Sequence, residues 1–168
     1  MIDAPSQFDF YSGGGLDTAF LGFGQIDHEG NVNVSKLDGV TVGPGGFIDI
    51  AQNARKVIFC GTFDAKGARF KTGDGKLFIK NPGQIRKFVR EVDQITFSGK
   101  QAQTQSQEVL YVTERAIFRL HENGLKLEEI APGVDLQKDI LDQMDFQPLI
   151  NTNPTIMDPS IFQEALHG

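Results

Sequence analysis

The stretch TVGPGGFIDIAQNARKVIFCGTF, residues 41–63, decides the fold. Glycine and proline fill positions 43–46, a composition that interrupts regular structure. Four apolar residues follow at the spacing i, i+3, i+4 and i+7, which is one face of a helix. They are Phe47, Ile50, Ala51 and Ala54. Residues 57–60 then form a continuous apolar run, typical of a strand buried on both faces of a sheet. A helix that leads directly into a buried strand indicates an α/β fold.

Strands and turns surround this segment. Sequence patterns predict a buried strand with glycine breaks at 18–26, an alternating strand at 30–35 and another strand at 108–114. Hairpins are expected at 69–80 and 116–130, because Asp74–Gly75 and Asn123–Gly124 tolerate the positive φ of a tight turn. Asp135 is the expected N-cap of a further helix.

One domain is expected, with an open mixed sheet, flanking helices and β-hairpins. Its parts are a lead-in at 1–16, a core at 17–150 and an extended, weakly structured tail at 151–168.

Composition narrows the class of protein. The 168 residues suit a single domain, and the apolar runs are too short to cross a bilayer. The N-terminus lacks the pattern of a signal peptide. A single cysteine, Cys60, fits a reducing compartment, and we expect a cytoplasmic protein without membrane contact. Within its apolar run, Cys60 is expected to be a packed side chain rather than a nucleophile.

Basic residues concentrate in the middle of the chain. Eleven of the 16 lysines and arginines lie between residues 51 and 100, although the net charge is −6. The acidic balance disfavours nucleic-acid binding. The basic zone is interpreted either as the solvated faces of hairpins or as a contact for a polyphosphate, with Lys71, Lys76 and Lys80 as candidates.

Two motifs suggest an anion site, whereas no pattern predicts a metal. The three histidines are widely spaced and lack neighbouring ligands. GPGGF, at 43–47, presents free N–H donors before a helix and suits a phosphate or an oxyanion, or it is only a turn. In GNVN, Asn31 and Asn33 share one face of a strand. They donate to the same kind of anion, or they are polar residues on an exposed edge strand.

Five blocks of sequence resemble the C-terminal part of the family I CoA-transferases, most of all the single-chain acetate/propionate/3-ketoacid branch. They are FDFYSGGGLDTAFLGFGQIDHEGNVNVSK, GPGGFIDIAQNARKVIFCGTF, EVDQITFSG, EVLYVTERAIFRL and APGVDLQKDILDQMDF. The resemblance covers nearly the whole chain in the same order. It implies part of the CoA-transferase (NagB/RpiA-like) fold.

The resemblance also implies a chemistry. Family members transfer coenzyme A from a short-chain acyl-CoA to a carboxylic acid. A glutamate attacks the thioester, and a mixed anhydride and then a glutamyl-CoA thioester form. No cofactor is implied besides the CoA thioester, which is a substrate. A homo-oligomer is expected.

Site residues follow from the same resemblance. The GPGGF element implies an acyl pocket and the backbone part of an oxyanion hole at Gly43, Gly45, Gly46 and Phe47. An asparagine of GNVN, either Asn31 or Asn33, is implied near the reacting carbonyl.

The chain departs from the family pattern at the nucleophile. The family's glutamate precedes the FDFY block, whereas the first glutamate here is Glu29, in a turn where nothing activates it. We therefore expect the nucleophile upstream of Met1, in an N-terminal portion or a partner subunit, and no activity from this chain alone. The alternative is a non-catalytic binding or assembly module that kept the fold. A relative of sugar-phosphate isomerases is a weaker possibility, because the blocks favour the transferases.

Overall fold

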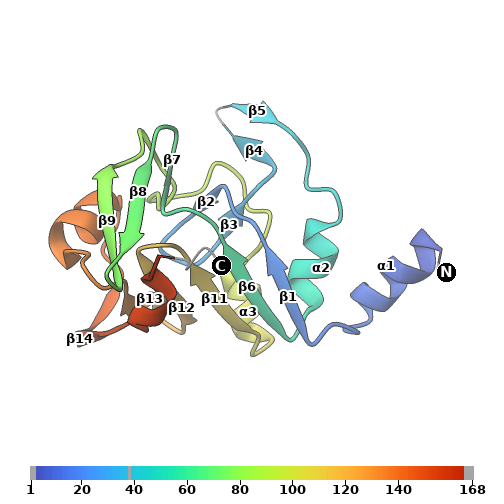
Figure 1. Ribbon diagram of the computed structural model, residues 1–168. Helices are drawn as coiled ribbons and strands as arrows, with labels where there is room; N and C mark the ends of the chain where they lie inside the picture. Colours follow the sequence, from blue (N-terminus) through green and yellow to red (C-terminus); the bar gives the residue numbers. More distant parts are fainter. Residues whose placement is uncertain (1–2, 38, 165–168) are drawn as a thin grey trace.

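A mixed six-stranded sheet forms the centre of the protein (Figure 1). The computed structural model describes residues 3–37 and 39–164. In spatial order the strands are β1 (Thr18–Leu21), β6 (Lys56–Cys60), β11 (Glu108–Val112), β12 (Ala116–His121), β13 (Gly124–Ile130) and β14 (Leu149–Ile156). The pairs β1–β6, β6–β11 and β13–β14 are parallel, whereas β11–β12 and β12–β13 are antiparallel. The expected open mixed α/β sheet is confirmed.

Short two-stranded ribbons lie above the sheet in the view of Figure 1. They are β2 (Gln25–Ile26) with β3 (Val32–Asn33), β4 (Lys36–Leu37) with β5 (Val40–Thr41), β7 (Asp64–Ala65) with β10 (Ile85–Arg86), and β8 (Arg69–Gly73) with β9 (Lys76–Asn81). The strand predicted at 18–26 is interrupted at residues 22–24, in line with its expected glycine breaks, and forms β1 and β2.

Both predicted hairpins form, but only one turn has the predicted residues. Asp74 and Gly75 connect β8 to β9 with φ of 52° and 69°, as expected of a type I′ turn. In the second hairpin His121 pairs with Gly124, so the connecting residues are Glu122 and Asn123. The expected Asn123–Gly124 turn is therefore displaced by one residue.

The helices are short. They are α1 (Ala4–Ser12), α2 (Phe47–Asn53), α3 (Gly99–Thr104), the π-helical turn η1 (Leu136–Ile140), and the 3₁₀ turns η2 (Leu141–Gln143) and η3 (Pro159–Phe162). The predicted helix at 47–54 is confirmed as α2. Asp135 caps η1, where its side chain accepts a hydrogen bond from the Lys138 N–H at 2.7 Å.

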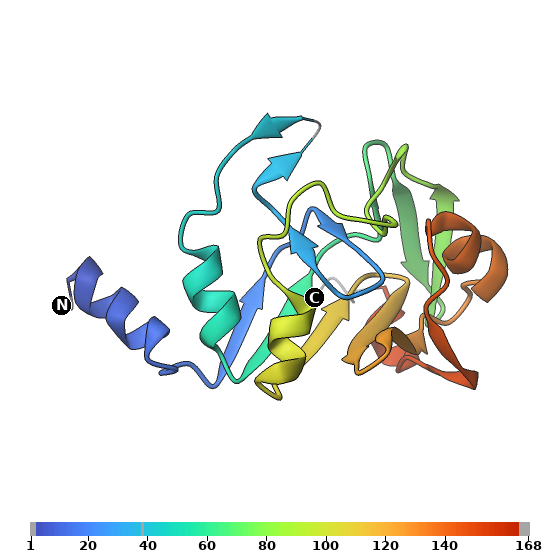
Figure 2. The same cartoon turned by 180° about the vertical axis from the view of Figure 1, so that it is seen from behind.

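Helices cover one face of the sheet over its parallel strands. Figure 2 shows α2 and α3 on the same side of β1, β6 and β11. Val57 and Phe59 of β6 point to this side and are fully buried. Phe59 stacks on Phe47 of α2 and on Tyr111 of β11, with ring centroids 5.9 and 5.5 Å away. The buried core therefore lies between β6 and α2.

The opposite face of the parallel strands is open. Phe20, Ile58 and Leu110 are neighbours in register across β1, β6 and β11. Phe20 is 69% exposed, whereas Ile58 and Leu110 are half-buried. The expectation that residues 57–60 are buried on both faces is wrong for this chain, because α2 and α3 cover only one of them.

Cys60 lies on the same open face. It is exposed, so its expected packing in the core is wrong. The alternation of side chains along β6 places it with Ile58 rather than with Phe59. Partial desolvation raises the pKa of its thiol, which disfavours the reactive thiolate.

The C-terminal segment differs from the expected weakly structured tail. Residues 149–156 form β14 at the edge of the sheet, and Pro154 lies where the register with β13 shifts. An edge strand tolerates proline at such a position. Met157 and Phe162 are buried against Leu77 of β9. The segment is therefore part of the packed structure as far as residue 164.

We predict that Gly99→Ala destabilises the protein strongly. A β-carbon at Gly99 would lie 2.1 Å from the carbonyl oxygen of Glu29, so α3 and the β2–β3 turn would have to separate. We expect the free energy of unfolding to fall by about 2 kcal/mol or more in urea denaturation. Gly22→Ala is the control, because no atom lies within 4 Å of a β-carbon there. Equal stability of the two variants would contradict this packing.

Candidate functional site

The GPGGF corner joins β5 to α2. Gly43 and Gly45 have φ of 79° and 53°, which glycine adopts at little cost. Both are exposed, whereas Phe47 is buried in the core. Among the described residues, none accepts a hydrogen bond from the N–H of Gly45 or of Gly46. The corner thus has a fixed base and backbone donors that are free to bind another group.

Helix α1 closes one side of this corner. A β-carbon at Gly46 would lie 2.8 Å from the Phe8 ring of α1. The helix was not predicted, although its start carries two recognisable signals. The Asp3 carboxylate accepts a hydrogen bond from the Ser6 N–H at 3.1 Å, and Pro5 occupies the first turn. An aspartate followed by proline near the start of a helix is the pattern that would have revealed it.

Asn33 lies close to the corner in the fold. The carbonyl of Ser35, two residues later, accepts hydrogen bonds from the N–H groups of Val42 and Gly43. The Asn33 amide itself donates to Gln25 Oε1 at 2.7 Å and to the Lys36 carbonyl at 2.5 Å. Its oxygen accepts from the N–H groups of Ser35 and Lys36. Asn33 therefore holds the β3–β4 turn, and its hydrogen-bonding groups are occupied.

Asn31 lies at the other end of the same strand. Its amide donates to Asp27 Oδ2 at 3.0 Å and to Glu29 Oε2 at 3.2 Å, and its oxygen accepts from the Gly99 N–H. Both asparagines are buried, so the reading of them as exposed edge residues is wrong. The structure places Asn33 beside the GPGGF corner and Asn31 beside Glu29.

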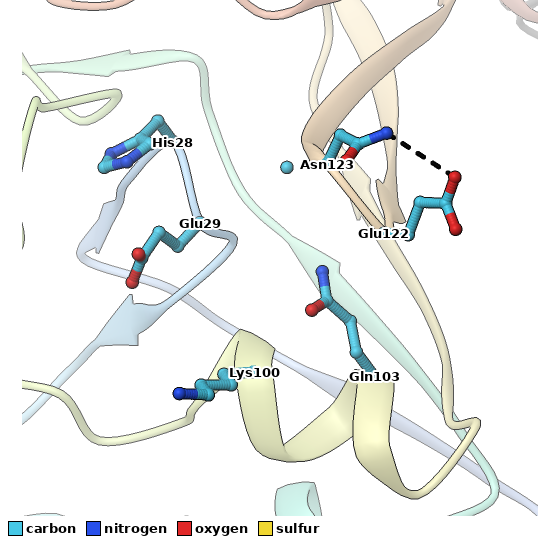
Figure 3. A pocket seen from close by; sticks show the side chains of 7 residues that line it. His28, Glu29, Lys100, Gln103, Glu122 and Asn123 are labelled. Carbon is cyan, nitrogen blue, oxygen red and sulfur yellow. Dashed lines mark hydrogen bonds between the residues drawn. The ribbon is translucent and has the colours of Figure 1, made fainter.

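A polar pocket opens next to Glu29 (Figure 3). Its volume is about 420 Å³. His28 and Glu29 come from the β2–β3 turn, Lys100 and Gln103 from α3, and Glu122 and Asn123 from the β12–β13 turn. Glu29 is exposed, and among the described residues its carboxylate accepts a hydrogen bond only from the Asn31 amide. Within residues 3–37 and 39–164, no basic side chain lies within hydrogen-bond distance of the Glu29 carboxylate.

Two of the candidate phosphate-binding lysines share a cavity. Lys71 and Lys80 line a space of about 560 Å³ beside the β8–β9 hairpin, together with Glu164. Lys71 forms a salt bridge with Glu164 at 3.3 Å. Lys76 does not line this cavity. The structure therefore brings together two of the three lysines.

Comparison of the sequence with known proteins identifies the family of this chain. No protein-family model matches the sequence. The chain is 52% identical over 168 residues to the acetate CoA-transferase YdiF of Escherichia coli K12, covering 100% of this chain and 32% of that protein. It is 51% identical over 172 residues to caffeate CoA-transferase of Acetobacterium woodii, covering 99% and 33%. It is 31% identical over 137 residues to the acetate CoA-transferase subunit beta of E. coli K12, covering 81% and 53%.

Solved structures agree with the sequence comparison. The YdiF acyl-CoA transferase of E. coli O157:H7, solved as a thioester complex with CoA, superposes with a TM-score of 0.95 at 53% identity. That match covers 98% of this chain and 32% of YdiF. The decarboxylase AibA/AibB shares the fold at 19% identity, with a TM-score of 0.67 over 98% of this chain and 59% of that one.

The chain thus spans about a third of the length of YdiF and of caffeate CoA-transferase. None of the helices in the described part of the chain is long and apolar enough to cross a membrane. The cytoplasmic location stays a prediction. On sequence and fold together, this chain belongs to the family I CoA-transferases and corresponds to their beta-type portion.

Proposed function

We propose that this chain is the beta-type part of an enzyme that transfers coenzyme A from a short-chain acyl-CoA to a carboxylic acid. The observation that carries the proposal is 52% identity to an acetate CoA-transferase over the whole chain, with the same fold. The GPGGF corner supports it, because the N–H groups of Gly45 and Gly46 are free to donate hydrogen bonds to the negative charge that develops on a reacting carbonyl oxygen.

The corner is the proposed oxyanion site. In thioester attack, charge develops on the carbonyl oxygen, and fixed N–H donors stabilise it without having to reorganise. Gly45 and Gly46 are the proposed donors. Gly43 shapes the loop, and Phe47 anchors it in the core. Of the two asparagines, Asn33 is proposed to support the corner and not to bind the carbonyl, because its amide is already bonded.

The nucleophile is proposed to be a glutamate outside this chain, which forms the glutamyl-CoA thioester. Glu29 is a poor substitute. It lies at the Asn31 end of β3, whereas the Ser35 carbonyl that contacts the GPGGF corner follows the opposite end. We therefore propose that Glu29 does not serve a carbonyl bound to Gly45 and Gly46.

The open sheet face is the proposed contact for the rest of the enzyme. Parallel strands are normally covered on both faces. Here Phe20, Ile58 and Leu110 form an apolar row across three strands without a covering layer in the described residues. Because YdiF is about three times longer than this chain, we assign this face to the alpha-type portion, in the same polypeptide or as a partner subunit.

Activity should require the missing portion. We expect no CoA transfer from acetyl-CoA to propionate by the purified chain. A chimera in which this chain replaces the matching segment of YdiF should catalyse the transfer, measured by chromatographic assay of propionyl-CoA. YdiF itself is the positive control. Turnover by the isolated chain would refute the proposal that the nucleophile lies outside this chain. A folded but inactive chimera would favour a non-catalytic module.

The oxyanion role is testable at Gly45. In the active chimera, Gly45→Ala forces a side chain into a backbone region that favours glycine, and this should misdirect the N–H donors. We expect kcat to fall by about 10²–10³-fold. Gly39→Ala is a matched control, since Gly39 also has positive φ, at 77°, and no atom lies within 4 Å of a β-carbon at either glycine. Equal loss of kcat in both variants would argue against a specific role for the corner.

A further inference from the structure

A buried lysine lies at the carboxyl ends of two parallel strands. Lys87 is only 8% exposed. Its ammonium donates to the carbonyl of Thr62, which follows β6, at 3.0 Å. It also lies 3.8 Å from the ring centroid of Phe23, which follows β1. In open α/β sheets, ligands bind outside the carboxyl ends of the strands.

The charge of Lys87 has no direct ion pair in the described part of the chain. Of the nearby carboxylates, Glu114 binds Arg115 and the Phe63 N–H. Asp64 binds Arg115 through Oδ2 at 2.5 Å, whereas its buried Oδ1 has no hydrogen-bond partner among the described residues. Burial therefore dominates and lowers the pKa of Lys87 to about 8, although Glu114 and Asp64 oppose this shift. A buried cation is normally paired.

Lys87 borders a cavity of about 280 Å³ whose walls are mostly apolar. The other lining residues are Phe23, Gly24, Gln25, Leu37, Ala65 and Ile85. They come from the β1–β2 link and from β2, β4, β7 and β10. The cavity is small compared with sites for drug-sized ligands, so it suits a molecule of few carbons.

We propose that this cavity binds a short aliphatic carboxylate, with its carboxylate on the Lys87 ammonium and its hydrocarbon body against Phe23, Leu37 and Ile85. A neutral apolar ligand would leave the ammonium unpaired. A phosphate would leave the apolar walls without a partner. The proposal stands without the transferase chemistry, since no residue of 43–47 lines the cavity.

Butyrate is the probe that tests this site. In NMR spectra of the protein with labelled leucine and isoleucine methyl groups, butyrate should shift the Leu37 and Ile85 signals saturably at constant ionic strength. Butanamide, which has a similar shape but no charge, should not. Lys87→Met should weaken butyrate binding at least about tenfold. Lys138→Met, at an exposed lysine outside the cavity, should leave it unchanged.

The pH dependence tests the same contact in the unaltered protein, in case Lys87→Met does not fold. Butyrate affinity should fall as the pH rises through about 8, because Lys87 then loses its charge. Glu114 and Asp64 are the charged groups that face it. Equal binding of butanamide, unchanged affinity above pH 8, or no saturable shift at millimolar butyrate would each overturn the proposal.

Discussion

The packing of Phe59 is the constraint on which the rest of the structure depends. Its ring contacts Phe47, Phe97 and Tyr111, with centroids 5.0–5.9 Å away. Phe47 begins α2 and so fixes the end of the GPGGF corner. Tyr111 donates its hydroxyl to the Gly30 carbonyl at 2.6 Å, which holds the β2–β3 turn. One side chain of β6 therefore sets the positions of both motifs that the sequence singled out.

Local patterns predicted the elements near this core well. The helix at 47–54 has an apolar face that packs as its spacing indicates, and Asp74–Gly75 forms the expected turn. These predictions succeeded because the decisive interactions lie within a few residues along the chain. The mixed α/β sheet followed from the same patterns and is confirmed.

Other features depend on distant contacts and were not predictable in this way. Cys60 belongs to the same apolar run as Phe59, and only the placement of α2 decides which of them is buried. Asn31 and Asn33 have equivalent positions in GNVN. Their different roles arise because Gly99 contacts one, whereas Gln25 contacts the other. Lys87 belongs to the basic zone by composition, and only the tertiary fold buries it.

The proposed enzyme combines a fixed corner, an open sheet face and a nucleophile supplied from outside the chain. In this proposal the alpha-type portion covers the face that carries Phe20, Ile58 and Cys60. Maleimide labelling of Cys60 tests this directly, because it is the only cysteine of the chain. With the cysteines of the added YdiF portion replaced, we expect labelling at fixed pH to slow at least about tenfold relative to the isolated chain. Equal labelling rates in an active chimera would contradict the claim.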